Sequence, residues 1–205
     1  RLAGQALERG DLAAAQKLLA PIAEQAELST QLVHSLLMLA RSGDMPISKA
    51  PVDLGQLARE VVDSLPSPGV HGPVTPRIDL ESLPIVQADG ALLRAVLTNL
   101  IGNAVKFTAG APDGAVRLRA GHADGEVTIS VSDNGVGFHP ESAASLFQPF
   151  TRLHAEQFAG TGVGLTIVRR IIERHGGRVW ATGQQGVGAT FSFTLPEALG
   201  NRRRT

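Results

Sequence analysis

The sequence predicts an α+β fold, with one mixed β-sheet carrying helices on one face. Residues 90–107 and 162–175 place apolar side chains at helical spacing, which indicates amphipathic helices. Residues 115–120 and 126–132 alternate polar and apolar side chains around turn residues 121–125, which is typical of a β-hairpin. Helices interspersed with mostly antiparallel strands in this order indicate an α+β sandwich.

The remaining elements follow in order along the chain. Asp89 precedes the long helix directly and is predicted to be its N-cap. Proline and glycine signal turns across residues 66–76. The other predicted elements are an amphipathic helix at 54–65, strands at 77–80 and 83–88, and closing strands at 178–182 and 190–195.

The first 45 residues form a separate unit in this prediction. Residues 12–41 show a heptad pattern, with Leu32 and Leu39 on one seam position and Ile22 and Leu36 on the other. A helical hairpin cannot bury such a stripe alone, so we expect a four-helix bundle made by two chains. The alternative is a helical cap on the following domain. The predicted division is a hairpin at 1–45, a linker at 46–53, a second domain at 54–197 and a tail at 198–205.

Composition excludes several classes of protein. The chain has 205 residues, with 19 basic and 19 acidic side chains and a formal net charge of zero, so we expect no nucleic acid partner. It has no cysteine, which excludes disulfides and thiolate metal sites. No apolar run approaches the roughly 18–20 residues of a membrane span, so we expect no membrane contact from this chain. Because the chain starts at Arg1 without a Met, we expect it to be a piece of a longer protein, whose upstream region could hold a sensor or a membrane anchor. We expect this piece to be cytoplasmic.

A polar stripe on the long helix is the first candidate site. Asn99, Asn103 and Lys106 lie at i, i+4 and i+7, so they share one face. Burying two amides and an ammonium is costly without partners. A metal–phosphate group would satisfy them, with amide oxygens facing the cation and Lys106 facing the phosphate. A solvated helix face is the alternative.

A carboxylate followed by two glycines is the second candidate site. Asp133 ends a predicted strand, and Gly135 and Gly137 would let a flat ligand lie against bare backbone. The carboxylate can accept a hydrogen bond from an exocyclic amine such as that of adenine. A tight Asx turn is the alternative.

Three glycines at a spacing of two form the third candidate site. Gly160, Gly162 and Gly164 open a helix, and backbone N–H groups at a helix N-terminus bind phosphate. A dinucleotide-binding Rossmann motif fails because no βαβ unit or ribose-binding acid follows. A Walker A loop fails because no G-K-[ST] occurs.

Two further segments complete the set of candidates. Residues 146–158 have mixed polarity before the glycine segment and are predicted to form a lid. Within this lid, Arg152 would either reach phosphate or make a surface ion pair. Residues 186–190 predict a hairpin turn, and they could also place the Thr190 hydroxyl beside Asp133, holding a water on the adenine edge.

These motifs, in this order, resemble the ATPase domain of sensor histidine kinases in the GHKL superfamily. NLIGNAVKFT, DNGVG, LFQPFTR, GTGVGL and GVGATF resemble its N, G1, F, G2 and G3 boxes. IIERHGGRVWA is similar to phytochrome-type and hybrid kinases. Residues 12–41 with PVDLGQLAREVV resemble the second dimerisation helix and its join to the catalytic domain. The resemblance implies a Bergerat-type α/β sandwich.

The resemblance also implies ATP and Mg²⁺ as ligands. It makes Asn103 the Mg²⁺ ligand, Lys106 a phosphate contact and Asp133 the adenine-reading acid, while Asn99 lines the same pocket. It implies transfer of the γ-phosphoryl group to a histidine and then to an aspartate of a response regulator. The resemblance assigns nucleotide contacts in the lid and glycine segment to Gly160, Thr161, Gly162, Gly164 and Leu165.

One departure concerns the phosphoacceptor. We find no H box; His34 lies in LVHSLL, whose neighbours do not match one. No catalytic residue is therefore identified, and the acceptor is expected upstream, so this chain should bind MgATP without phosphorylating itself. The alternatives are a degenerate nucleotide-sensing or scaffolding module and a hydrolysing GHKL ATPase. Hydrolases carry a carboxylate on this helix, whereas this chain has Asn99 four residues before Asn103.

Overall fold

The computed structural model describes residues 12, 19, 47–65, 76–108, 111, 113–123, 125–154, 157–158 and 160–196. The predicted hairpin at 1–45 therefore lies almost entirely outside the described residues, as does the tail at 198–205. Leu12 and Leu19 are helical and exposed. The boundaries of these two units and the dimeric bundle stay predictions.

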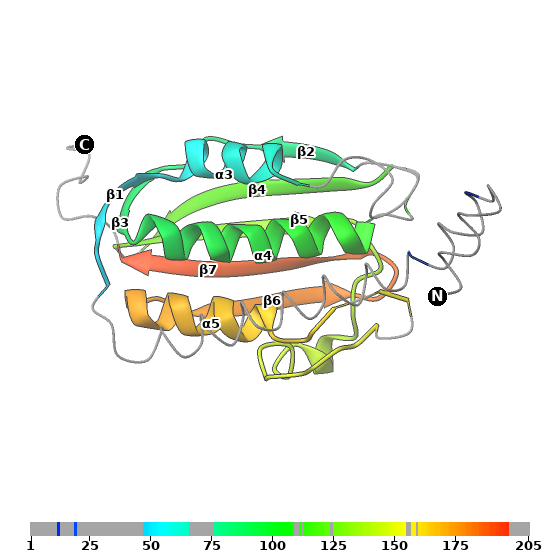
Figure 1. The fold of residues 1–205 in the computed structure, drawn as a ribbon. Helices are drawn as coiled ribbons and strands as arrows, with labels where there is room; N and C mark the ends of the chain where they lie inside the picture. The colour runs from blue at the N-terminus through cyan, green and yellow to red at the C-terminus, as the bar shows by residue number, and fades with distance from the viewer. Residues whose placement is uncertain are drawn as a thin grey trace.

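A five-stranded mixed sheet forms one layer of the molecule (Figure 1). The strands lie in the order β2 (Arg77–Leu80), β4 (Ala115–Ala123), β5 (Glu126–Asp133), β7 (Gly188–Pro196) and β6 (Val179–Gln184). β2 runs parallel to β4, and the other neighbours are antiparallel. The predicted mixed, mostly antiparallel sheet is confirmed.

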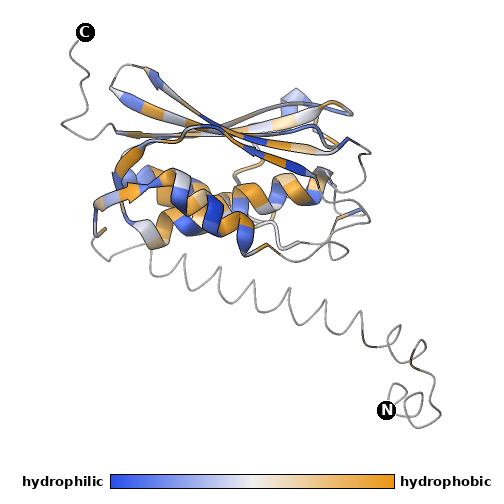
Figure 2. Cartoon of the chain, turned by 90° about the horizontal axis from the view of Figure 1, so that it is seen from above, coloured by the Kyte–Doolittle hydropathy of each residue, from blue (hydrophilic) through white to orange (hydrophobic). Residues whose placement is uncertain are grey.

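Three helices form the second layer and cover a single face of the sheet, as Figure 2 shows from above. They are α3 (Leu54–Asp63), α4 (Gly90–Thr108) and α5 (Gly164–His175). α4 begins where predicted, because the Asp89 carboxylate accepts hydrogen bonds from the N–H groups of Ala91 and Leu92, both at 3.1 Å. The predicted α+β sandwich is therefore confirmed.

The core lies between these layers. Alternate residues of β5 are buried toward the helices, while the intervening ones remain partly exposed on the other face. α4 buries one apolar stripe against this surface. The fully buried large side chains include Leu93, Leu97, Leu100, Ile101, Leu118, Ile129, Ile171, Ile172, Phe193 and Leu195.

Part of the predicted linker is a strand. β1 (Ala50–Asp53) pairs antiparallel with β3 (Ile85–Ala88) in a separate two-stranded sheet. The predicted linker at 46–53 thus contains a strand that the sequence did not indicate, because the pairing is between segments distant in the chain and leaves no local periodicity. Asp53 then caps α3 by accepting a hydrogen bond from the Gln56 N–H at 2.9 Å.

Other elements differ from prediction at their ends. The β4–β5 hairpin extends into the predicted turn, so that Ala123 pairs with Glu126. α5 begins at Gly164 rather than residue 162, and β7 begins at Gly188 rather than residue 190. A short 3₁₀ helix, η1 (Pro140–Ser142), lies in the connection between β5 and α5. These shifts matter below, because side chains alternate along a strand.

Candidate functional site

The polar stripe runs along the C-terminal half of α4, on the side next to the glycine segment. Asn99, Asn103 and Lys106 are all half-buried. The Asn99 Nδ2 group donates to the Ala95 carbonyl at 2.9 Å. Among the residues that the structure describes, none makes a side-chain hydrogen bond with Asn103. Its amide therefore remains available to a ligand.

Asn99 lies close to the first residue of α5, a proximity that the sequence did not indicate. A Cβ atom on Gly164 would lie only 2.2 Å from Asn99 Oδ1. A larger residue at position 164 would therefore force the end of the Asn99 side chain to move. The polar stripe and the glycine segment thus lie next to each other at Asn99.

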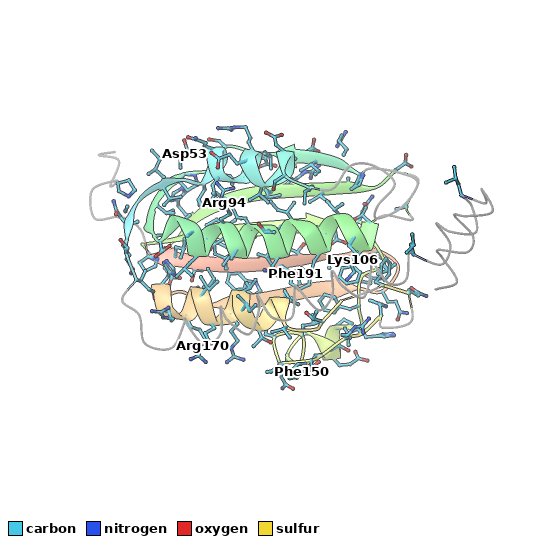
Figure 3. All side chains as sticks on the ribbon, viewed as in Figure 1. Asp53, Arg94, Lys106, Phe150, Arg170 and Phe191 are labelled. Atoms are coloured by element: carbon cyan, nitrogen blue, oxygen red, sulfur yellow. The ribbon has the colours of Figure 1, made fainter. Side chains whose placement is uncertain are left out.

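Lys106 lies in the last turn of α4 (Figure 3), and its ammonium group lies next to the glycine segment. Its Nζ atom lies 4.7 Å from the centre of the Phe107 ring, and a Cβ atom on Gly160 would lie 3.2 Å from Nζ. Burial lowers the pKa of Lys106, and the positive charge of Arg152 lowers it further. A bound phosphate would counteract both effects.

Asp133 is a buried carboxylate at the end of β5. It is 9% exposed, and its Oδ1 atom accepts a hydrogen bond from the Gly135 N–H at 2.9 Å. Burial raises the pKa of Asp133 to about 6, although hydrogen bonds from the Gly135 and Ala189 backbones oppose that rise. A hollow of ≈ 370 Å³ lies at this end of the sheet, lined by Asp133 and by residues 182–184 and 187–190. As a hydrogen-bond acceptor, the carboxylate can read a donor of a ligand.

Gly135 and Gly137 are required by close backbone packing. A Cβ atom on Gly135 would lie 2.2 Å from the Phe107 carbonyl oxygen. Gly137 has φ +60°, and its Cβ atom would lie 2.0 Å from the Gln184 carbonyl oxygen. The Val136 N–H also donates to the Phe107 carbonyl at 3.2 Å. This turn therefore joins the end of α4 to the β6–β7 hairpin; contact with a ligand stays a prediction.

The glycine segment leads directly into α5. Gly162 has φ +71° and lies against Phe150, whose N–H donates to the Gly162 carbonyl at 2.9 Å. Thr161 Oγ1 accepts a 3.4 Å hydrogen bond from the Val163 N–H, and Leu165 packs partly buried against the core. No side chain caps the start of α5. Backbone N–H groups at such a helix start stabilise an anion, and this one begins beside Asn99 of the polar stripe.

The predicted lid lies over the end of α4. Arg152 is exposed and donates to the Phe158 carbonyl at 2.8 Å, so its predicted reach to phosphate stays a prediction. His154 Nε2 lies 2.8 Å from the Gly137 carbonyl oxygen. The rings of Phe107 and Phe158 meet edge to face at 4.9 Å. Sequence analysis missed this aromatic contact, although a phenylalanine directly after Lys106 and another just before Gly160 were available signals.

The predicted position of Thr190 was wrong. Its hydroxyl lies 2.9 Å from that of Ser132, which is its neighbour across β5 and β7. Asp133 pairs instead with Ala189. Since adjacent residues of a strand point to opposite faces, Thr190 lies on the face away from Asp133. The residue beside the carboxylate on the helix-covered face is therefore Ala189, which has no hydroxyl to hold a water.

The described residues contain no cluster of three or more His, Asp or Glu side chains that could hold a metal ion. A hard cation here would take one oxygen from the Asn103 amide and the others from phosphate and water.

No helix among the described residues is long and apolar enough to cross a bilayer.

Comparison with known proteins agrees with this architecture. Residues 88–199 match the family described as histidine kinase-, DNA gyrase B- and HSP90-like ATPase. Cyanobacterial phytochrome B of Nostoc sp. is 36% identical over 172 residues, covering 81% of this chain and 22% of the relative. The circadian input-output histidine kinase CikA of Synechococcus elongatus is 32% identical over 184 residues, covering 86% of this chain and 24% of the relative.

Two solved structures extend the comparison. Full-length ShkA in complex with AMPPNP superposes with a TM-score of 0.72 at 35% identity, covering 90% of this chain and 39% of that one. The catalytic domain of histidine kinase ThkA superposes with a TM-score of 0.57 at 27% identity, covering 75% of this chain and 97% of that one.

The chain belongs to the histidine kinase-, DNA gyrase B- and HSP90-like ATPase family. Within that family it is related to the ATP-binding catalytic region of sensor histidine kinases. It spans only 22% and 24% of the length of the first two relatives.

Proposed function

We propose that this chain is the ATP-binding catalytic region of a protein-histidine kinase in a two-component system. It binds ATP with Mg²⁺ and supplies the γ-phosphoryl group to a histidine outside this chain. The phosphoryl group then passes to an aspartate of a response-regulator receiver domain. The observation that supports this most directly is the convergence of Asn103, Lys106 and the glycine segment at one end of α4, with Asp133 at the nearby end of β5.

Each group has a role that follows from its chemistry. The Asp133 carboxylate accepts a hydrogen bond from the adenine amine. Lys106 and the N–H groups at the start of α5 contact the phosphate oxygens, where negative charge gathers. The Asn103 amide oxygen would hold Mg²⁺, which supplies neutralisation of phosphate charge when bound.

The transfer itself depends mainly on position and charge. The bond between the γ-phosphorus and its bridging oxygen breaks, a bond to the acceptor imidazole nitrogen forms, and ADP leaves. The lid closes over the phosphates through Phe158 and His154 and excludes competing water. Asn99 supports transfer over hydrolysis, because an amide cannot act as the general base that would activate water.

Calorimetric titration with ATP, with and without Mg²⁺, tests this proposal. We expect Mg²⁺ to strengthen binding to the unaltered chain. Asn103→Ala should remove that strengthening while leaving weaker, metal-independent binding in place. Thr98→Ala is the matched control, since Thr98 is exposed on α4 outside the polar stripe.

Two results would contradict the proposal. If the unaltered chain does not bind ATP, a scaffolding role replaces the kinase role. If Asn103→Ala retains the full Mg²⁺ effect, the metal ligand is misassigned.

We also propose that residues 1–45 hold two copies of the chain together. Removing residues 1–41 should convert a dimer into a monomer in light scattering. A dimer that persists would place the interface elsewhere.

A further inference from the structure

Three separate parts of the chain meet at His175, which the proposed function does not use. His175 is the last residue of α5 and is 1% exposed. Its Nε2 atom accepts a hydrogen bond from the Asp89 N–H at 3.0 Å, directly before α4 begins. Its carbonyl oxygen accepts a hydrogen bond from Lys49 Nζ at 3.3 Å. The C-terminal end of α5, the N-terminal end of α4 and the segment that enters the domain are thus joined.

The hydrogen bonds fix the protonation state of this histidine. The Ile171 carbonyl lies 2.8 Å from Nδ1 and can only accept, so Nδ1 carries the proton. The Asp89 N–H can only donate, so Nε2 must remain unprotonated. The charged groups around the ring are Lys49, Asp89 and Arg174. Both ring nitrogens are therefore satisfied by backbone groups of two different elements.

The entering segment contacts both helices rather than one. Besides the Lys49 contact with α5, the Ser48 N–H donates to Asp89 Oδ2 at 3.4 Å. The other oxygen of Asp89 caps α4. A displacement of residues 48–49 therefore acts on the start of α4 and on the end of α5 together.

This junction lies at the far end of the helices from the candidate nucleotide site. In Figure 1, α4 begins and α5 ends on the side where β1 enters. α4 has 19 residues, which makes it about 28 Å long. Near the middle of α4, Asn99 lies close to Gly164, the first residue of α5. α5 therefore runs from the joint at His175 to the glycine segment beside the polar stripe, so a change in its angle at one end moves the other end.

We propose that Lys49 and His175 form a joint that sets the position of α5 relative to α4 and thereby tunes nucleotide affinity. The input is a displacement of the chain that precedes Ile47. Lys49 and His175 are positioning residues, since neither touches the nucleotide site. This inference rests on the proposed function, because it names how that site is regulated.

The test compares Lys49→Met with Arg170→Met. Each variant replaces one exposed cation by an uncharged chain of similar length, but Arg170 lies on α5 with its side chain away from the joint (Figure 3). We expect Lys49→Met to weaken ATP binding about threefold or more relative to Arg170→Met. We also expect faster amide hydrogen exchange at residues 99–108 of the ligand-free protein.

A purely structural Lys49 would lower thermal stability without either change. Suppose that the unaltered chain binds ATP. The proposal is then overturned if Lys49→Met binds ATP as tightly as Arg170→Met does, or if amide hydrogen exchange at residues 99–108 is equally fast in the two variants. If the unaltered chain does not bind ATP, the proposed function fails, and exchange at residues 99–108 alone decides whether the joint exists. His175→Gln provides a second variant: when folded, it should accelerate the same exchange, and unchanged exchange would overturn the joint.

Discussion

Two buried titratable side chains lie at opposite ends of the helical layer, and they differ in how they are satisfied. His175 is neutral, and backbone groups use both of its nitrogens. Asp133 has hydrogen bonds from backbone N–H groups, yet burial still raises its pKa to about 6. The joint end is therefore arranged for stability, whereas the site end holds a charge that the protein alone stabilises poorly.

The cost at the site end can be estimated. A rise from 3.8 to about 6 corresponds to about 3 kcal/mol of folding stability lost when Asp133 is ionised at neutral pH. A domain has only roughly 5–15 kcal/mol in total. A binding site can keep a buried carboxylate at this loss of stability when a ligand offsets it. Here the amine of a bound base would donate a hydrogen bond to the carboxylate. The comparison thus separates a residue kept for binding from one kept for architecture.

The largest expected effects come from two glycines, one at each end. A Cβ atom would lie 2.2 Å from the Phe107 carbonyl oxygen in Gly135→Ala and 1.8 Å from the Thr194 carbonyl oxygen in Gly177→Ala. Each variant should lose about 3 kcal/mol or more. Thermal unfolding measures the loss, and Gly121→Ala is the control, since its Cβ atom would meet nothing within 4 Å. Full stability in either variant would mean that the backbone there relaxes easily.

Asp133→Asn should have the next largest effect and should separate binding from stability. Losing the charged acceptor should weaken ATP binding by about 2–3 kcal/mol. The ligand-free protein should gain up to about 3 kcal/mol, since the buried charge is removed. Calorimetry and thermal unfolding report the two changes.

Two controls accompany this variant. Binding of inorganic triphosphate should be unchanged, because Asp133 is predicted to read the base. Thr190→Val should leave ATP affinity unchanged, because its hydroxyl faces Ser132. Equal losses of ATP and triphosphate binding in Asp133→Asn would refute the base-reading role.

A pH titration of stability should show the two groups acting in opposite directions. Burial is the main cause that lowers the pKa of His175 from 6.5. The stability that neutral His175 contributes to the fold is therefore complete above about pH 6.5 and is lost as the pH falls. The raised pKa of Asp133 means that its cost disappears as the pH falls from above about 6 toward 4. Asp133→Asn should therefore lose stability more steeply than the unaltered chain between pH 7 and 5. Parallel profiles would mean that Asp133 does not titrate in this range.

The smallest expected effect lies midway between the two ends. Gly102 is in the interior of α4, and a Cβ atom there would meet nothing within 4 Å. Gly102→Ala should stabilise the protein by about 0.5–1 kcal/mol, because alanine favours helix more than glycine does. Unfolding in denaturant measures the gain. A loss would indicate that the chain needs flexibility beside Asn103.

Local signals predicted much of this structure from sequence. The Asp89 cap, the β4–β5 hairpin and the long helix all depend on residues close together in the chain. The same periodicity placed Asn99, Asn103 and Lys106 on one face. These elements were predictable because a helix or a hairpin turn is specified by its own residues.

Non-local contacts explain the errors. Nothing near Ala50 indicates that it will pair with Ala88. Thr190 was placed on the wrong face, since a strand has a period of two and a shift of one residue reverses every side chain. The joint at His175 was likewise unpredictable, because Asp89 and Lys49 lie 86 and 126 residues away from it along the chain. That the predicted residues bind ATP remains a proposal to be tested.

The only tryptophan of the chain gives the molecule a built-in optical probe. Trp180 lies on the edge strand β6, paired with Ser192 and 5.7 Å from the Arg178 guanidinium. Because Trp180 pairs with Ser192 and Ser192 pairs with Ser130, the Trp180 side chain lies on the sheet face away from Asp133. Its fluorescence should therefore report unfolding of the sheet directly. Any change in emission on adding nucleotide would have to travel through the sheet or α5, and would measure how far binding is felt beyond the pocket.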